Sequence, residues 1–372
     1  MKRSIIVLIF PFLLYSCEKF EDYNPVIDTG PEPTNLVTPE KAEKITNVIY
    51  NTLNSNELIG IQVSIRDRLN ESWNASFGAT DLKQRNKLEN QHILRIGSVT
   101  KIFTATLLLK LIQLNYLQPD QYLSEFYPDI KEIKGVTIKD LLNHSSGIAD
   151  VFSIPSIFIA SSNFPDKLWN PNHLAKVCME KKLQFSPGSE HAYSNTNFII
   201  LGLVAEKATG KKVSELFSEY IIEPNNLTNT SLVPYMNTSP NLINGYVHNY
   251  ALSLKEWYPT VPENTSWATV GFTAGAMTSN STDLSTFTYR LFSGEILWDA
   301  SLKLMTTFSD DYGLGLKKIK VNDHYSWGHE GEITGFESIT AYNPDTGIVI
   351  SICCNTTPFK IQELLNKIDA EL

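Results

Sequence analysis

The stretch "HILRIGSVTKIFTATLLLKLIQ", residues 92–113, joins two polar side chains to a long apolar run. From Ile102 onward, leucine and isoleucine are dense enough to predict a buried helix. Ser98 and Lys101 stand just before that run, and side chains three residues apart share one face of a helix. The stretch therefore predicts a hydroxyl and an amine side by side at the start of the most apolar helix in the chain.

The pairing of Ser98 with Lys101 fits a nucleophile and its base. A lysine in an apolar setting loses solvation, so its neutral form becomes accessible. The neutral amine can take the hydroxyl proton, and backbone N–H groups at the helix N-terminus face the charge that develops during attack. A chain of 372 residues contains a Ser-x-x-Lys spacing about once or twice by chance, so this motif alone also fits a purely structural role.

A second polar motif is Tyr-x-Asn at Tyr193 and Asn195, after a Pro-Gly turn and before an apolar helix. A phenol whose pKa is lowered by neighbouring cations would serve as a proton shuttle. The Asn195 amide can bind a substrate carbonyl and the lysine ammonium together. The same spacing begins at Tyr235, but that copy lies in a loop rich in Pro and Asn with no helix behind it, so we set it aside.

The third motif lies in "YSWGHEGEITGFESITAY", residues 325–342. His329 and Gly331 precede a predicted strand, and the glycine leaves the backbone open to close approach. A strand edge beside an active site offers a backbone N–H to a developing oxyanion, here that of Glu332. For His329 alone, a hydrogen-bonded turn or surface histidine is the simpler interpretation.

Together and in this order, the three motifs resemble those of the serine penicillin-recognising enzymes. That family includes class C β-lactamases, low-molecular-mass D-alanyl-D-alanine carboxypeptidases, D-aminopeptidases and related esterases. Its Ser-x-x-Lys, Tyr-x-Asn and Lys-Thr-Gly or His-x-Gly motifs converge on one cleft. The likeness runs from about residue 40 to the C-terminus, and three further segments resemble the family: "LLNHSSGIAD" (141–150), "GFTAGAMTSNSTDLSTF" (271–287) and "YGLGLK" (312–317).

The resemblance implies a role for each motif residue. Ser98 corresponds to the acylated nucleophile, Lys101 to its proton acceptor and Tyr193 to the group that passes a proton to the leaving group. Asn195 orients the substrate amide. His329, in a His-x-Gly motif completed by Gly331, supports the hydrogen bonds of Tyr193.

The resemblance also places the amides of Ser98 and Glu332 in the oxyanion hole. It implies neither metal nor cofactor, and the histidines lack a recognisable ligand spacing. His144 in "LLNHSSG" is a tempting base, but the matching family segment is structural, so we expect a hydrogen-bonded turn histidine there.

The sequence departs from the family where carboxypeptidases hold a terminal carboxylate. The cation for that task is present as Lys317, but Glu330 and Glu332 occupy positions where close relatives have hydroxyls. Like charges repel strongly in a dry site. We therefore expect weaker binding of a free carboxylate and a preference for an amine, amide or neutral ester, unless both side chains turn outward.

The pattern of elements predicts an α+β fold with an α/β sandwich lobe and an all-α lobe, as in β-lactamases and DD-peptidases. Strands are expected near both ends of the chain, including a hairpin around residues 343–347. One antiparallel sheet built from both ends and covered by helices accommodates them. A helical lobe is inserted at roughly residues 110–280.

The N-terminus has two cations, a short apolar run and then Cys17, which is typical of a lipoprotein signal. The expected organisation is a signal peptide at 1–16, a lipid anchor on Cys17, a tether at 17–38 and the hydrolase domain at 39–372. This places the protein in a bacterial cell envelope, facing the periplasm or the cell surface. An ordinary signal peptide with an incidental cysteine is the alternative. The odd number of remaining cysteines argues against a disulfide framework.

Composition narrows the function further. Without the signal peptide, 29 basic residues face 40 acidic ones, and no basic cluster is present, which disfavours nucleic-acid binding. The leading hypothesis is a serine hydrolase acting through an acyl-enzyme, most like a D-alanyl-D-alanine carboxypeptidase on cell-wall-type D-peptides. The alternatives are an esterase or D-aminopeptidase, then a class C-like β-lactamase, and last a non-catalytic binder. The expected partners are a D-amino-acid peptide, an ester or a β-lactam, and the membrane through the anchor.

Overall fold

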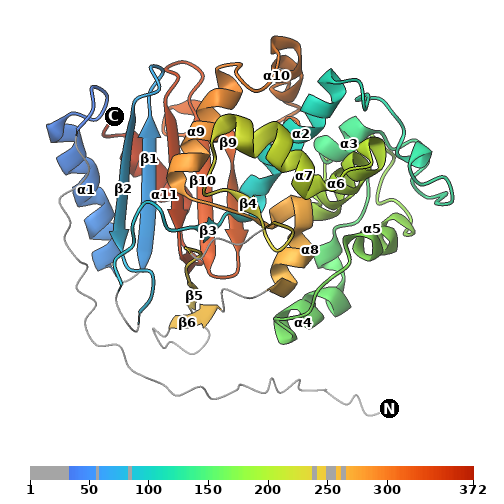
Figure 1. Cartoon of the computed structure of the whole chain (residues 1–372), viewed down its shortest axis with the longest axis horizontal. Helices are drawn as coiled ribbons and strands as arrows, with labels where there is room; N and C mark the ends of the chain where they lie inside the picture. Colours follow the sequence, from blue (N-terminus) through green and yellow to red (C-terminus); the bar gives the residue numbers. More distant parts are fainter. Residues whose placement is uncertain (1–32, 56–57, 83–85, 237–240, 249–256, 261–264) are drawn as a thin grey trace.

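The structure is a computed structural model that describes residues 33–372 except 56–57, 83–85, 237–240, 249–256 and 261–264 (Figure 1). The expected signal peptide, Cys17 and most of the tether lie outside the described residues. Within the described part, no helix combines the length and apolarity needed to cross a membrane.

Strands gather near the two ends of the chain, and the helices of residues 100–217 follow one another without an intervening strand, in an α+β arrangement. The α-helices are α1 (Pro39–Asn54), α2 (Thr100–Gln113), α3 (Ile138–Leu142), α4 (Pro155–Asn163), α5 (Pro171–Met179), α6 (Asn195–Thr209), α7 (Val213–Phe217), α8 (Thr265–Gly275), α9 (Ser281–Phe292), α10 (Asp299–Met305) and α11 (Ile361–Asp369). The strands are β1 (Gly60–Arg66), β2 (Ser72–Gly78), β3 (Leu94–Arg95), β4 (Ser231–Leu232), β5 (Gly245–His248), β6 (Trp257–Thr260), β7 (Met277–Ser279), β8 (Lys317–Val321), β9 (His324–Ile333), β10 (Phe336–Tyr342), β11 (Val349–Cys354) and β12 (Thr356–Thr357).

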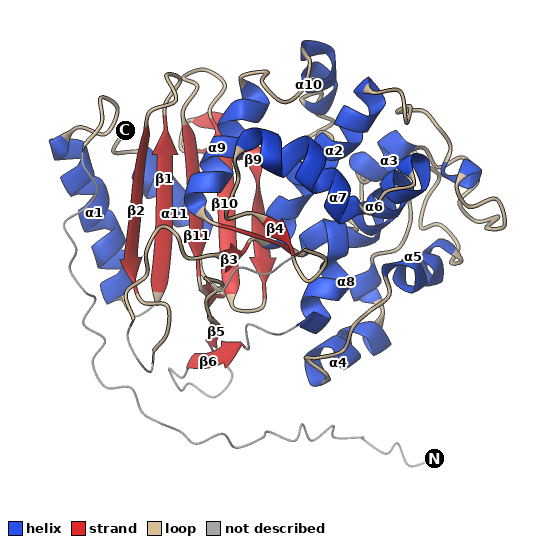
Figure 2. Cartoon of the chain, in the orientation of Figure 1, coloured by secondary structure: helices blue, strands red, loops and turns tan. Residues whose placement is uncertain are grey.

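The main sheet is antiparallel and has the order β2-β1-β11-β10-β9-β8. Its centre joins the two ends of the chain, because β1 pairs with β11, with Ile61 opposite Cys354. Figure 2 shows this sheet beside a separate group of helices. The predicted fold class, with a sheet built from both chain ends, is confirmed.

Each face of the sheet has its own cover. Alternate residues of β1, such as Ile61 and Val63, are buried in a core shared with α1 and α11. The residues between them face α9, where Ser64 Oγ lies 2.6 Å from Ser285 Oγ. Sheet and helices therefore form three layers, and β11 in the middle layer is buried along its whole length.

The cysteines of the described residues belong to the core. Cys178, Cys353 and Cys354 are buried and none of them forms a disulfide. They serve as small apolar side chains, and the absence of a disulfide among them agrees with the sequence analysis.

Helix α2 is buried around nearly its whole circumference. It packs between α6, α8 and the sheet, and its residues from Thr100 to Leu109 are buried, including Lys101. A helix that is apolar all round belongs inside a protein, and this one forms the junction of sheet and helical lobe. The residues that precede α2 are therefore fixed on several sides.

Candidate active site

Ser98 lies in the short 3₁₀ turn Gly97–Val99 that leads into α2. The residue before the turn is held from two sides, because the Ile96 N–H donates to the Met277 carbonyl at 3.0 Å and the Ser338 hydroxyl donates to the Ile96 carbonyl at 2.8 Å. Gly97 has a φ of +47°, a conformation that favours glycine. The hydroxyl thus comes from a turn clamped between β7 and β10.

Lys101 is completely buried, and its Nζ has three polar neighbours. Nζ lies 2.9 Å from Ser98 Oγ, 2.8 Å from Asn195 Oδ1 and 2.8 Å from the Ala274 carbonyl oxygen. Burial holds the pKa of Lys101 well below its usual value, and the charge of Lys317 lowers it further. A neutral amine fits this cage, since two N–H bonds donate to the two carbonyl-type oxygens and the lone pair accepts the Ser98 O–H.

Tyr193 approaches the same hydroxyl from the other side. Its O–H donates to Ser98 Oγ at 2.9 Å, while the residue as a whole is 36% exposed. The prediction that cations lower the pKa of this phenol is wrong: burial raises it, and the Asp150 and Glu330 charges raise it further. The physical reason is that the buried hydroxyl loses solvation, which disfavours the charged phenolate. Tyr193 is therefore a phenol poised to donate a proton.

Asn195 is oriented by a carboxylate that the sequence analysis did not nominate. Asp150 Oδ1 accepts the Asn195 backbone N–H at 2.9 Å, and its Oδ2 accepts the side-chain N–H at 3.4 Å. With its nitrogen directed at Asp150, the amide presents its oxygen to Lys101. Asp150 thus fixes which end of the Asn195 amide faces the amine.

The backbones of η1 (Gly97–Val99) and β9 approach each other too closely for side chains between them. A methyl group at Gly97 would lie 2.8 Å from the backbone nitrogen of Glu332. A methyl group at Gly331 would lie 2.9 Å from the backbone nitrogen of Ser98 and 2.0 Å from the Ile96 carbonyl oxygen. The two amides expected in the oxyanion hole therefore lie across one narrow gap.

His329 belongs to the site, and it contacts the surroundings of Tyr193 through Tyr312. It is 1% exposed, and its Nε2 lies 3.2 Å from the Tyr312 hydroxyl. Tyr312 in turn lies 3.1 Å from Nε2 of His144, which is a buried turn histidine as expected. The His144 ring, not the His329 ring, lies closest to Tyr193, at 4.4 Å between centroids against 6.2 Å.

Lys317 and Glu330 form an ion pair at the edge of the site. Their side chains are 31% and 45% exposed, respectively. Glu332 is exposed and opposes Glu337 of β10, so Glu330 and Glu332 share one face of β9 as expected. Lys317 is therefore already neutralised where the resemblance calls for a free cation.

The residues that sequence reasoning missed are Asp150, Tyr312 and the carbonyl of Ala274. Each lies inside a segment that resembles the family, in residues 141–150, 312–317 and 271–287. A lone aspartate or tyrosine carries no spacing signal, so those segments were the available clue.

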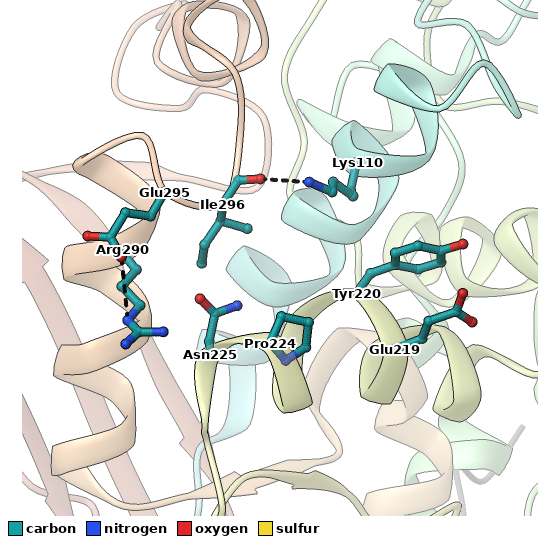
Figure 3. A pocket seen from close by; sticks show the side chains of 8 residues that line it. All are labelled: Lys110, Glu219, Tyr220, Pro224, Asn225, Arg290, Glu295 and Ile296. Atoms are coloured by element: carbon teal, nitrogen blue, oxygen red, sulfur yellow. Dashed lines mark hydrogen bonds and ion pairs between the residues drawn. The ribbon is translucent and has the colours of Figure 1, made fainter.

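The described residues contain no cluster of three or more His, Cys, Asp or Glu side chains that could hold a metal ion. A separate pocket of about 210 Å³ lies at the far end of α2, about 14 Å along the helix from Lys101 (Figure 3). The cationic side chains that line this pocket already have partners. Lys110 donates to the Ile296 carbonyl at 3.2 Å, and Arg290 lies 3.6 Å from Glu295. The chemistry is therefore concentrated around Ser98.

Replacing Tyr193 with phenylalanine should lower the rate of acyl transfer about a hundredfold or more, because the leaving group loses its proton donor. The rate is measured with an ester and an amide of the same acyl group. The amide should suffer more than the ester, since an amine leaves poorly without a proton. Equal losses on both would contradict a role of Tyr193 in leaving-group protonation.

The chain is similar to known proteins both in sequence and in structure. The family model described as Beta-lactamase matches residues 45–371. A penicillin-binding protein of Bacillus subtilis (strain 168) is 26% identical over 258 residues, which cover 65% of this chain and 56% of that protein.

Two solved structures are similar over nearly the whole described chain. The D-amino acid amidase of Ochrobactrum anthropi SV3 has a TM-score of 0.79 at 22% identity and covers 89% of this chain and 98% of that one. A D-stereospecific amidohydrolase of a Streptomyces species has a TM-score of 0.75 at 26% identity, with coverage of 89% and 98%.

Proposed function

The chain belongs to the beta-lactamase family, and on that basis we propose that it hydrolyses peptide or amide bonds of D-amino acids through an acyl-enzyme on Ser98. The observation that carries the proposal is the three-sided cage of the buried Lys101, whose Nζ lies within 2.9 Å of the Ser98 hydroxyl, the Asn195 amide oxygen and the Ala274 carbonyl oxygen. A serine hydrolase needs this combination of a nucleophile and an uncharged base.

Acylation begins with the transfer of the Ser98 proton to Lys101 Nζ. The Ser98 oxygen forms a bond to the substrate carbonyl carbon, and negative charge collects on the carbonyl oxygen. The backbone amides of Ser98 and Glu332 stabilise that charge across the gap kept open by Gly97 and Gly331.

Collapse of this intermediate breaks the bond to the leaving nitrogen. Tyr193 gives that nitrogen its proton, and the proton held on Lys101 neutralises the resulting phenolate, so the acyl-enzyme is left with a neutral amine and a neutral phenol. A water molecule then attacks the ester, loses a proton to the same pair of groups, and restores the Ser98 hydroxyl. Atoms and charge balance over the cycle without any further reagent.

The preferred substrate class is a D-configured peptide of the cell-wall type, and the expected activity is that of a D-alanyl-D-alanine carboxypeptidase. This rests on the motif versions at Ser98, Tyr193 and His329 and on relatives described as a penicillin-binding protein and a D-stereospecific amidohydrolase.

A second candidate, hydrolysis of D-amino acid amides, short D-peptides or esters that lack a terminal carboxylate, has its own supporting observation. Lys317 is paired with Glu330, and the neighbouring Glu332 adds another negative charge. The edge of the site therefore repels a free carboxylate more than it attracts one.

One experiment tests the proposed reaction and ranks the substrates. The purified protein is incubated with D-peptides, D-amino acid amides, esters and a cephalosporin, and the intact mass of the protein is measured. An acyl adduct on Ser98 with turnover of D-peptides or D-amides is the expected result. Adducts only with L-configured substrates, or none at all, would refute the proposal.

Replacing Glu330 with glutamine should shift the preference between carboxylate and amide substrates. The change frees Lys317, so KM for an acyl-D-Ala-D-Ala peptide should fall about three- to tenfold, a modest effect because the pair is partly exposed. KM for the corresponding C-terminal amide should stay within about twofold.

The matched control for this prediction is Glu332→Gln, which removes an equal charge without releasing Lys317. If both variants change KM for the two substrates equally, the ion pair does not select the leaving group.

A further inference from the structure

His144 holds the chain on both sides of Tyr193. Its carbonyl oxygen accepts the backbone N–H of Ala192 at 3.0 Å, and its ring Nδ1 accepts the backbone N–H of Ser194 at 3.2 Å. The imidazole and the phenol ring lie 4.4 Å apart between centroids. One residue thus contacts the tyrosine ring and fixes the residues before and after it.

The backbone of His144 is itself in an uncommon conformation, with a φ of +60°. A non-glycine residue adopts this region at some energetic cost, which the surrounding contacts must offset. The side chain is fully buried, so its ring cannot exchange these contacts for water. The turn is therefore held in one arrangement by the same hydrogen bonds that hold the loop of Tyr193.

The donors around His144 fix its tautomer. Nδ1 faces two N–H groups, those of Ser194 and of the Asn197 side chain, the latter at 3.2 Å. Nδ1 must therefore be unprotonated, and the ring proton resides on Nε2. From there it donates to the Tyr312 hydroxyl at 3.1 Å.

His329, at the other end of this series of hydrogen bonds, has the opposite tautomer to His144. Nδ1 of His329 faces the carbonyl oxygen of Glu330, an acceptor, so this nitrogen carries the proton. Nε2 of His329 then accepts the Tyr312 hydroxyl at 3.2 Å. The hydrogen bonds run in one direction from the Ser194 amide to the Glu330 carbonyl, with Tyr312 at the centre.

All three side chains are buried, at 0% exposure for His144, 5% for Tyr312 and 1% for His329. Both imidazoles stay neutral, because burial lowers their pKa and the charge of Lys317 lowers it further. His191 also faces His144 and acts in the same direction. This series of hydrogen bonds requires neutral rings, since an imidazolium has no unprotonated nitrogen that can accept a hydrogen bond.

We propose that His144 is a positioning residue for Tyr193 and that the Tyr312 hydroxyl, as the acceptor of its Nε2–H, keeps the ring in place. Its effect on the rate rests on the proposed function, because Tyr193 matters as the proton donor to the leaving group. Removal of the Tyr312 hydroxyl leaves Nε2–H of His144 without an acceptor and Nε2 of His329 without a donor. The His144 ring then reorients, and the Tyr193 hydroxyl moves away from Ser98.

The kinetic test is Tyr312→Phe, which keeps the ring and removes the hydroxyl. We expect kcat to fall about 10- to 100-fold with KM within about threefold, since a shift near 1 Å suffices for such a loss. The matched control is Tyr127→Phe, whose buried hydroxyl has no hydrogen-bond partner among the described residues. The control should stay within about twofold, and an equal loss in both variants would overturn the proposal.

The second measurement uses the unmodified protein and does not depend on any substrate. Nitrogen-15 NMR of the histidine rings should show His144 protonated on Nε2 and His329 protonated on Nδ1, both neutral between pH 5 and pH 8 (about one unit or more around the usual histidine pKa). Identical tautomers would overturn the proposal. If a Ser98→Ala protein were still acylated, the proposed function would fail while the tautomers remained a separate result.

Discussion

Replacing Ser98 with alanine should abolish acyl transfer, with a loss of about 10⁴-fold or more in kcat/KM. The hydroxyl is the group on which the amine of Lys101 and the phenol of Tyr193 converge, each at 2.9 Å. Without it, neither proton-transfer group has a nucleophile to serve. The measurement is labelling by a fluorescent penicillin, with intact mass of the protein as a second readout.

The control for this variant is Ser189→Ala, which removes an exposed hydroxyl from the loop before Tyr193. That protein should label at the rate of the unmodified one. Ser98→Ala should lower the unfolding temperature, because the buried Lys101 amine and the Tyr193 hydroxyl each lose a hydrogen-bond partner, but the protein should still unfold in one cooperative transition. Labelling that survives in Ser98→Ala would place the nucleophile elsewhere.

Replacing Lys101 with methionine should lower the acylation rate about a hundredfold or more, the usual contribution of a general base. Methionine fills a similar apolar volume, so the loss reports the missing amine. The pH dependence has a definite sign. Because the neutral amine is the active form and burial lowers the pKa of Lys101, the rate should rise with pH and level off below the ordinary lysine value of 10.5.

The Lys101→Met protein should lose that rise with pH. Lys110→Met is the matched control, since this lysine lies on the same helix but contacts only the pocket at its far end. It should keep both the rate and the pH profile. A Lys101→Met protein that retains the rate within about threefold would show that another group takes the Ser98 proton.

The sequence predicts the relation of Ser98 to Lys101 because that relation is local. Three residues of helical chain place two side chains on one face, whatever surrounds the helix. The sheet built from both ends follows from strands near each end and from the resemblance to a known family. Ile61 of β1 lies opposite Cys354 of β11, and both side chains are buried.

The properties that the sequence does not predict depend on contacts between distant segments. Whether Tyr193 gains or loses acidity depends on the burial of its hydroxyl and on the charges of Asp150 and Glu330, which come from distant segments. Tyr312 joins His144 to His329 only because three separate segments meet. The ion pair of Lys317 with Glu330 likewise forms between neighbouring strands. Because of it, the lysine that the resemblance assigned to carboxylate binding already has a carboxylate partner within the protein.

The pairing of β1 with β11 also sets when the enzyme becomes competent during its synthesis. Ser98 and Lys101 are translated early, but β9 and β11 leave the ribosome only after the helical lobe. A nascent chain therefore carries a nucleophile with no amide from Glu332 to stabilise an oxyanion. Hydrolysis cannot begin until translation is nearly finished, and a chain clipped before Val349 would be inert.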